Sequence, residues 1–269
     1  MTSARVADMA RRGGRAWRRD DIALIASVAT IVAAAWVYVV VQAQQMAASS
    51  AREGMSIGMA MPQASDAWSP GVLASQFAIW MAMMVAMMLP TAIPMTLIYT
   101  AVARKASHHR ALAATALFVT GYAAMWLLFS AAAMFAQVAL QQGAHLSALM
   151  ALRSTPAAGA LLIAAGAYQL TPLKRACLRN CRSPVHFLSR HWQQGSVGAG
   201  RMGALVGAFC VGCCWVIMAL LFVGGAMNLL WAAAIAIFVL MEKVAPFGVT
   251  AGRLAAPMLV GAGILLIVF

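Results

Sequence analysis

The chain has 269 residues, of which 64% are hydrophobic and only 9% are charged, and its mean hydropathy is +0.85. No soluble domain could cover so much apolar surface, so the composition predicts an integral membrane protein and excludes a water-soluble or DNA-binding one. The formal net charge of +13 does not indicate nucleic acid as a partner, because the basic residues lie in short segments between apolar runs. The five cysteines favour reduced thiols over a disulfide framework, because none lies in a segment expected outside the cell.

The first expected element is a signal anchor. Residues 1–21 form a basic cytoplasmic arm, and the apolar run at 22–43 reaches the length of about 20 residues that a bilayer-spanning helix needs. We expect this helix to stay uncleaved; cleavage after Ala43 is the alternative. Residues 44–71 are expected to form an extracytoplasmic loop. Its methionines resemble thioether patches that capture copper, although gap filling is the favoured role for this loop alone: Met46, Met55, Met59 and Met61.

A methionine-rich second span is expected at 72–102. One helical face carries Met81, Met84, Met88 and Met95 within about 60°, and Met83 and Met87 form a neighbouring strip. Pro90 and Pro94 each remove a backbone donor, which should bend the helix and place it inside the bundle, where the freed carbonyls find partners. A methionine stripe is usually core, but this density beside two prolines exceeds what packing demands. The expected soft-metal ligands here are Met81, Met84, Met87, Met88 and Met95.

Further apolar runs predict spans at 111–140, 156–170, 204–223, 229–240 and 254–269. The fold class is therefore all-α: a polytopic membrane helix bundle with about seven transmembrane helices, in a membrane domain that covers 72–269. Seventeen Lys and Arg lie in the segments on one side and two on the other. The positive-inside rule then places the amino terminus in the cytoplasm and the carboxy terminus outside.

A basic cytoplasmic loop at 171–203 carries two cysteines. Thr171 followed by Pro172 predicts a helix start and Pro184 predicts its end, so Cys177 and Cys181 should share one face as i and i+4 neighbours. Their cationic neighbours should lower the thiol pKa and favour the metal-binding thiolate. A Cys/His site with His186 and His191 is one interpretation; a basic helix touching anionic lipid headgroups is the other.

Three more thiols lie inside the apolar run at 204–223. At about 100° per residue, Cys210, Cys213 and Cys214 fall on one side of a helix. Thiolates and thioethers together favour Cu(I), and zinc is favoured only if imidazole joins them. A packing face is an equal alternative, because Gly203 and Gly207 have the small-x-x-x-small spacing of helix contacts. Counted from the expected helix ends, the depths of Cys213 and the methionine stripe overlap, so the two clusters can meet if their helices are neighbours.

These stretches carry a family likeness. The run Met-Met-Val-Ala-Met-Met-Leu-Pro, the segment Tyr-Gln-Leu-Thr-Pro-Leu-Lys-x-x-Cys-Leu-x-x-Cys-Arg-Ser-Pro and the Cys-Val-Gly-Cys-Cys-Trp helix with its later Glu-Lys resemble the predicted metal-binding integral membrane protein family, also called domain of unknown function family 2182. The resemblance covers roughly 72–246 and implies a bacterial inner-membrane protein with soft-metal ligands, but no reaction. The motif residues are Met84, Met87, Met88, Cys177, Cys181, Cys210, Cys213, Cys214 and Glu242.

The leading hypothesis is a copper-handling membrane protein that transports Cu(I) or supplies it to a membrane cuproenzyme. Its partners would be the lipid bilayer, a copper chaperone or the cuproenzyme itself. A thiol–quinone oxidoreductase using Cys213 and Cys214, or Cys177 and Cys181, is the second hypothesis, and a metal-free structural or assembly subunit is the third. The spans hold no Ser-His-Asp arrangement and no paired carboxylates, so a non-enzymatic role is favoured. Glu242 beside Lys243 is expected to form an interfacial ion pair.

Overall fold

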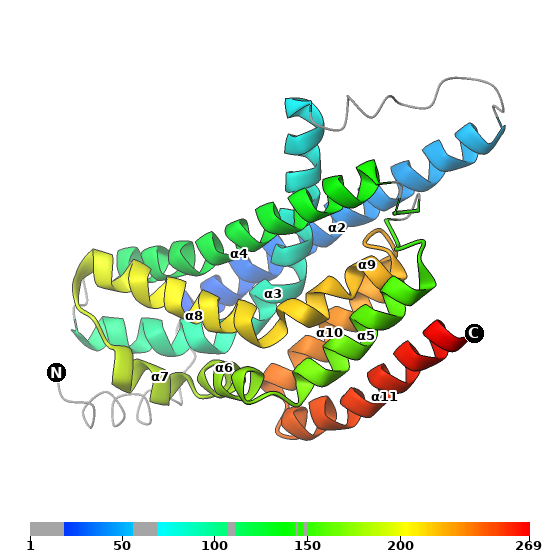
Figure 1. Cartoon of the computed structure of the whole chain (residues 1–269). Helices are drawn as coiled ribbons and strands as arrows, with labels where there is room; N and C mark the ends of the chain where they lie inside the picture. The colour runs from blue at the N-terminus through cyan, green and yellow to red at the C-terminus, as the bar shows by residue number, and fades with distance from the viewer. Residues whose placement is uncertain (1–18, 56–68, 107–110, 144, 148–149) are drawn as a thin grey trace.

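The computed structural model describes residues 19–55, 69–106, 111–143, 145–147 and 150–269, and these residues form an all-helical bundle (Figure 1). Within these ranges there is no strand, only an isolated antiparallel bridge between Leu146 and Leu152. The all-α prediction is confirmed. The helices are α2 (Arg19–Met55), α3 (Pro70–Ala106), α4 (Ala111–Gln142), α5 (Thr155–Gln169), α6 (Pro172–Arg182), α7 (Pro184–His191), α8 (Gly195–Ala219), α9 (Leu221–Gly224), α10 (Leu229–Val244) and α11 (Gly248–Val268).

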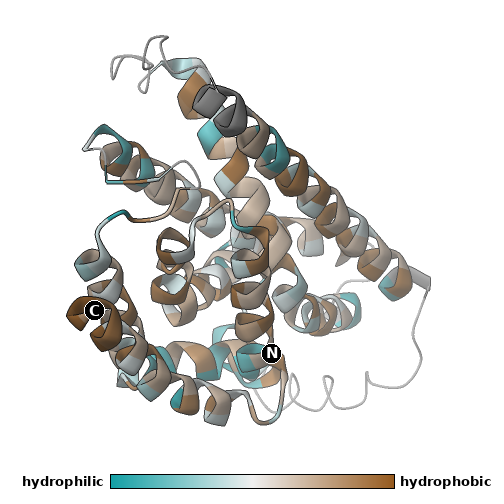
Figure 2. Ribbon diagram, turned by 90° about the vertical axis from the view of Figure 1, so that its right-hand side faces the viewer, coloured by the Kyte–Doolittle hydropathy of each residue, from teal (hydrophilic) through white to brown (hydrophobic). Residues whose placement is uncertain are grey.

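Five segments of the described chain are long and apolar enough to cross a membrane. Hydrophobic residues dominate the helical ribbons in Figure 2. The expected number of seven is not confirmed, because α5 and α10 have 15 and 16 residues and measure only about 22–24 Å, less than the hydrocarbon core of about 30 Å. The five segments are Asp21–Ala48, Pro70–Lys105, Ala111–Gln142, Gly195–Gly224 and Gly248–Val268.

The two short helices nevertheless return the chain across the bundle. In Figure 1, α4 and α8 run in the same direction, and α5, which follows α4 in the chain and packs against α11, runs the opposite way. Helix α10, which follows α8 and α9 in the chain, likewise runs opposite to α8 and α11. Each return begins at a defined turn. The Asn228 side chain caps α10 by accepting from the Trp231 amide at 3.2 Å, and Gly225 has φ of 91°, a conformation that glycine adopts without strain. A tight turn, in which the Asn228 amide donates to the Gly225 carbonyl oxygen at 3.0 Å, therefore precedes α10.

Several predicted boundaries are shifted. Helix α2 continues to Met55, so the first part of the expected loop at 44–71, including Met46, is helical; Met59 and Met61 lie outside the described residues, as do residues 1–18 of the basic arm. Helix α8 begins at Gly195, so the last part of the loop expected at 171–203 belongs to the helix whose span was expected to start at 204. The boundaries of α6 are as predicted, because Thr171 caps it through a bond from the Lys174 amide at 3.2 Å and Pro184 starts the next helix.

Helix α3 bends visibly along its length in Figure 1 and contains both Pro90 and Pro94. It packs against α2, α4, α7 and α10, and the methionine stretch is buried, with Met84 and Met88 completely enclosed. The expected place of this segment inside the bundle is confirmed. The bend matters for the site because it brings the middle of α3 against α4 and α10 at the level of Met88.

Glycines allow two helix pairs to approach at backbone distance. A Cβ atom on Gly203 of α8 would overlap the carbonyl oxygen of Phe118 on α4, and Gly159 of α5 faces Gly263 of α11 in the same way. Small residues at such contacts are what helix packing in membranes favours. The α4–α8 contact holds the cysteine helix in the centre of the bundle, where it also packs against α6 and α10.

Candidate functional site

Helix α8 presents three buried thiols toward the bundle interior. Cys210, Cys213 and Cys214 are each no more than 3% exposed, and all five cysteines of the chain are free. The thiols of Cys213 and Cys214 donate to the carbonyl oxygen of Cys210, at 3.1 and 2.9 Å. This arrangement places the three side chains on one side of α8, as their i, i+3, i+4 spacing predicts.

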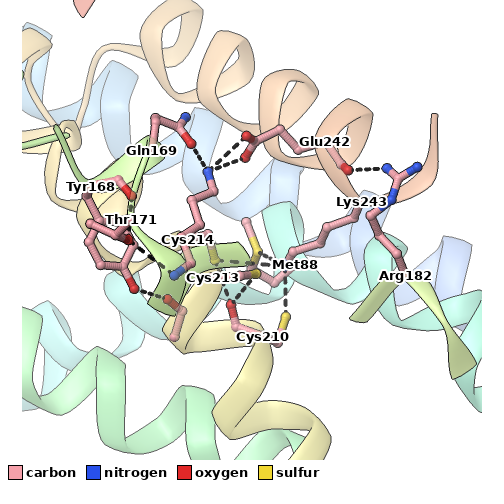
Figure 3. Close-up of polar contacts among 12 residues, drawn as sticks. Met88, Tyr168, Gln169, Thr171, Arg182, Cys210, Cys213, Cys214, Glu242 and Lys243 are labelled. Atoms are coloured by element: carbon pink, nitrogen blue, oxygen red, sulfur yellow. Dashed lines mark hydrogen bonds and ion pairs between the residues drawn. The ribbon is translucent and has the colours of Figure 1, made fainter. Parts of the chain in front are cut away.

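A lysine lies among these sulfur atoms (Figure 3). The Lys243 ammonium from α10 donates to Cys210 Sγ at 2.8 Å and lies 3.8 Å from Cys214 Sγ. It also contacts Met88 Sδ on α3 at 3.7 Å. Lys243 is only 7% exposed, so its charge is balanced within the protein. Sulfur atoms from two helices therefore converge on one buried cation carried by a third helix.

The ion pair expected between Glu242 and Lys243 is wrong. Figure 3 shows the two neighbouring side chains leaving α10 toward different partners, because successive residues on a helix point about 100° apart and cannot face each other. Glu242 instead pairs with Lys174 of α6, through Oε1 at 2.9 Å and Oε2 at 2.7 Å. The adjacent positions of Glu242 and Lys243 on one helix already indicate that the two side chains point apart and that Lys243 needs another partner. The expectation of an ion pair overlooked this.

The Glu242–Lys174 pair is part of a polar brace between α5, α6 and α10. The Lys174 ammonium also donates to Gln169 Oε1, and Arg182 donates to the backbone carbonyl of Glu242. Both members of the pair are buried. A buried ion pair needs such additional hydrogen bonds to offset desolvation. The brace fixes the end of α10 that carries Lys243.

Tyr122 of α4 joins the methionine helix to the cysteine helix. Its hydroxyl group lies 3.2 Å from Cys210 Sγ and donates to the Met88 carbonyl oxygen at 3.2 Å. The same residue lines the inner part of a largely apolar cavity of about 710 Å³ between α2, α3 and α4. Hydroxyl groups follow the cavity wall, where Thr100 and Thr115 are hydrogen-bonded at 3.1 Å. The Cys210 sulfur thus lies just behind a residue that the cavity reaches.

Helix α6 adds a fourth thiol to the assembly. Hydrogen bonds to Cys210 and Cys213 raise the pKa of the Cys181 thiol, and burial adds to this shift. We call Met88, Cys181, Cys210, Cys213 and Cys214 the sulfur cluster. The cluster combines donors from three separate helices, α3, α6 and α8.

Cys177 lies beside the cluster and packs against α8. Its sulfur lies 3.0 Å from the position that a Cβ atom on Gly212 would occupy, so a side chain there would crowd it. Burial raises the pKa of the Cys177 thiol. The expected lowering of the Cys177 and Cys181 pKa values by cationic neighbours is therefore wrong. The charged ends of long basic side chains can reach water, so they do not compensate for the burial of the thiol.

The remaining methionines of the stripe line the surrounding core. Met84, Met87 and Met95 are buried, and Met81 Sδ accepts from Ser130 at 3.8 Å. Of this stripe, Met88 is the member whose sulfur lies against Lys243. Helical periodicity alone does not select Met88 from the stripe, because the selection depends on where α10 places Lys243 against α3.

Histidine does not complete a site in the described part of the chain. The His191 Nδ1 atom lies 3.1 Å from the Phe187 carbonyl oxygen, and the two rings stack. Among the described residues, no group of three or more His, Cys, Asp or Glu side chains is placed as a ready-made metal site. The sulfurs surround an ammonium at 2.8–3.8 Å, whereas metal–thiolate bonds are about 2.3 Å. A metal ion would therefore draw the sulfurs together.

One family model matches most of the chain. Residues 77–266 match the PpoB2 family, described as a copper chaperone. The match confirms the expected copper connection, while the family name given by the sequence resemblance and the membrane assignment remain predictions. No curated protein and no solved structure among those compared matches the chain. The matched range contains every residue of the sulfur cluster and Lys243, and it leaves α2 outside.

Proposed function

Because the chain belongs to the PpoB2 copper chaperone family, we propose that it is a membrane protein that binds Cu(I) in the sulfur cluster and passes it to a copper-requiring partner. The observation that carries this proposal is the convergence of Met88, Cys210 and Cys214 on the Lys243 ammonium. Soft sulfur donors from separate helices surround a monovalent cation there. A buried arrangement of this composition suits Cu(I) better than a hard cation.

Thiolate and thioether donors would have different roles in holding and releasing the copper ion. Thiolates of Cys210, Cys213 and Cys214 would offset the charge of copper inside the bundle, where an unpaired charge is costly. The neutral thioether of Met88 would hold it weakly. Met81, Met84, Met87 and Met95 would supply transient contacts along α3. Copper is preferred over zinc because every donor of the sulfur cluster is a sulfur atom, and the His191 Nδ1 atom lies against the Phe187 carbonyl oxygen instead.

The proposed location is the bacterial inner membrane, with the amino terminus in the cytoplasm. The five apolar segments support a membrane protein, and the return of the chain through α5 and α10 supports two further crossings despite their length. The copper source would be a chaperone, and the recipient a membrane cuproenzyme. Both are proposed from the copper chemistry of the family and not from a contact in the structure.

Metal analysis of detergent-purified protein tests the function. We expect about one copper per chain after anaerobic purification, because the cluster offers one set of soft donors. The triple variant Cys210→Ser, Cys213→Ser, Cys214→Ser should lose it, and Met88→Leu should bind it more weakly. Two control variants each replace a buried sulfur-containing residue that is not part of the sulfur cluster. These variants, Cys177→Ser and Met83→Leu, should retain copper. Equal copper in the native protein and the triple variant would refute the site.

A redox role is the second candidate, and the contact of Cys181 with Cys210 and Cys213 favours it. Two neighbouring thiols could form a disulfide while their two electrons and two protons reduce a quinone to a quinol. The number of free thiols decides between the two functions. A reversible loss of two thiols on adding quinone, with no bound copper, would support the redox role; five stable thiols beside bound copper would exclude it.

A further inference from the structure

Lys243 is a buried cation whose partners are sulfur atoms. Its ammonium lies 2.8 Å from Cys210 Sγ, 3.7 Å from Met88 Sδ and 3.8 Å from Cys214 Sγ. The neighbouring carboxylate of Glu242 uses both oxygens to bind Lys174. A buried charge has to be paired. The Lys243 ammonium therefore faces the same sulfurs that the proposed function assigns to copper, and among them the Cys210 sulfur, as a thiolate, balances its charge.

The ammonium and a copper ion compete for the same space. The three sulfur contacts enclose the Nζ atom from α3 and α8, and a metal bonded to these sulfurs at about 2.3 Å would lie between them. The ammonium and Cu(I) each carry a single positive charge, so exchanging one for the other beside Cys210 leaves the charge that faces this sulfur unchanged. A divalent ion would add one charge to an interior that tolerates it poorly.

From this geometry we propose that Lys243 is an exchangeable internal cation: Cu(I) enters the sulfur cluster by displacing the Lys243 ammonium, which returns when copper leaves. The inference rests on the proposed function and adds the means by which the ion is released. The flexible four-carbon stem of lysine lets the ammonium move while α10 stays in place. The polar brace between Glu242 and Lys174 keeps the backbone of α10 fixed during the exchange.

The exchange explains how a sulfur-rich site could serve transfer. Copper bound by several thiolates alone would be held tightly and released slowly. When copper binds, the hydrogen bonds from the ammonium to the sulfurs are lost, and this loss lowers the net free energy of copper binding. When copper leaves, the ammonium returns and forms these hydrogen bonds again. Lys243 would thus set the affinity of the cluster without being a ligand.

Competition with a Cu(I)-selective chelator tests this proposal at fixed pH. The variant Lys243→Leu removes the charge without adding a donor and should need about tenfold more chelator to lose its copper, as expected for loss of a charged hydrogen bond that opposes binding. Lys243→Arg keeps the charge and should stay within about threefold of the native protein. Lys243→Gln provides a neutral polar substitute if the leucine variant does not fold. Circular dichroism and size-exclusion chromatography show whether each variant keeps the native helix content.

The outcomes separate this inference from the proposed function. Tighter copper binding and slower release to the chelator in the neutral variants support exchange. Unchanged or weaker binding in folded neutral variants overturns it, while the copper site stands. A native protein that binds no Cu(I) overturns both proposals. A lysine with a purely structural role would give no gain in copper affinity.

Discussion

Sulfur side chains of neighbouring helices have different surroundings in this protein. Cys210 meets Lys243 and Tyr122, whereas the Cys177 sulfur lies beside Gly212. A thiol next to an ammonium has a partner that stabilises its anionic form, and a thiol in apolar packing has none. The reactivity of each cysteine thiol therefore depends on its tertiary contacts and cannot be predicted from the residue type alone.

Cys177 should react as a thiol with a raised pKa. In a chain whose other four cysteines are replaced by serine, we expect the rate of maleimide labelling at Cys177 to keep rising with pH above the ordinary thiol pKa. The reason is that burial raises the pKa of this thiol, so at any pH below that value the reactive thiolate is scarcer than in an ordinary cysteine. Quenched-flow or gel-shift labelling across the pH range measures the profile.

The control for that measurement is the same chain unfolded in denaturant. Its labelling rate should level off near the ordinary thiol pKa of about 8.5. A folded-state profile that levels off at lower pH would show that the basic neighbours on α6 dominate over burial, contrary to the structure.

At the scale of the elements, α6 and α10 are joined by a buried ion pair. Lys174 and Glu242 come from the two helices and are 3% exposed at their side chains. Gln169 from α5 shares the ammonium. The pair places the last turn of α10, and with it Lys243, against α3 and α8. We infer that the role of this buried network is to fix the position of α10 relative to α5 and α6.

Removing one partner should destabilise the bundle more than removing both. Glu242→Gln leaves the Lys174 charge buried without a counterion, and we expect a loss of about 3 kcal/mol in the free energy of unfolding. The double variant Lys174→Met, Glu242→Leu should lie within about 1 kcal/mol of the native protein, because no charge is then buried. Denaturant unfolding in detergent, followed by circular dichroism, measures each value.

The matched control on α6 is Arg179→Gln, at an exposed position of the same helix, with an expected change below about 0.5 kcal/mol. If Glu242→Gln proves as stable as the native protein, the ion pair does not brace α10. The proposed fixed position of Lys243 would then need another cause.

On the scale of the whole molecule, the direction of each helix determines which helix ends would share a side of the membrane in the proposed arrangement. The basic residues of α6 and α7 precede α8, and Arg153 precedes α5. These two regions lie on opposite sides only if α5 crosses the bilayer. Length alone argues against that crossing, and the path of the chain in Figure 1 argues for it. A helix shorter than the bilayer can cross where the membrane thins or polar side chains reach the interface.

Single introduced cysteines test the seven-crossing arrangement. In a chain without its own cysteines, we expect a membrane-impermeant maleimide to label Arg153→Cys in intact cells. Arg190→Cys and Arg253→Cys should be labelled only after permeabilisation; all three positions are exposed. The positive-inside rule and the crossing by α5 together give this result. Labelling of positions 153 and 190 from the same side would show that α5 does not cross.

The amino-acid sequence by itself determined the helical class, the apolar segments, the start of α6 at Thr171 and the common face of Cys210, Cys213 and Cys214. Each of these follows from hydropathy, capping or helical periodicity, which act between residues close in the chain. The soft thiol and thioether donors of the sequence also led to copper, in agreement with the family match. The end of α2 and the start of α8 were misplaced, because the polar residues after Ala43 do not end the first helix and the glycines after Gly195 do not keep the second from starting.

Only the tertiary structure decided the composition of the sulfur cluster. Lys243 and Met88 are separated by 155 residues, and no local pattern specifies that they touch. The selection of Met88 from its stripe follows from where α10 places Lys243 against α3, and the inclusion of Cys181 follows from the packing of α6 on α8. The physical reason is that a site built from several helices depends on their mutual rotation and depth, which the close glycine contacts and the buried Lys174–Glu242 pair establish after the helices have formed.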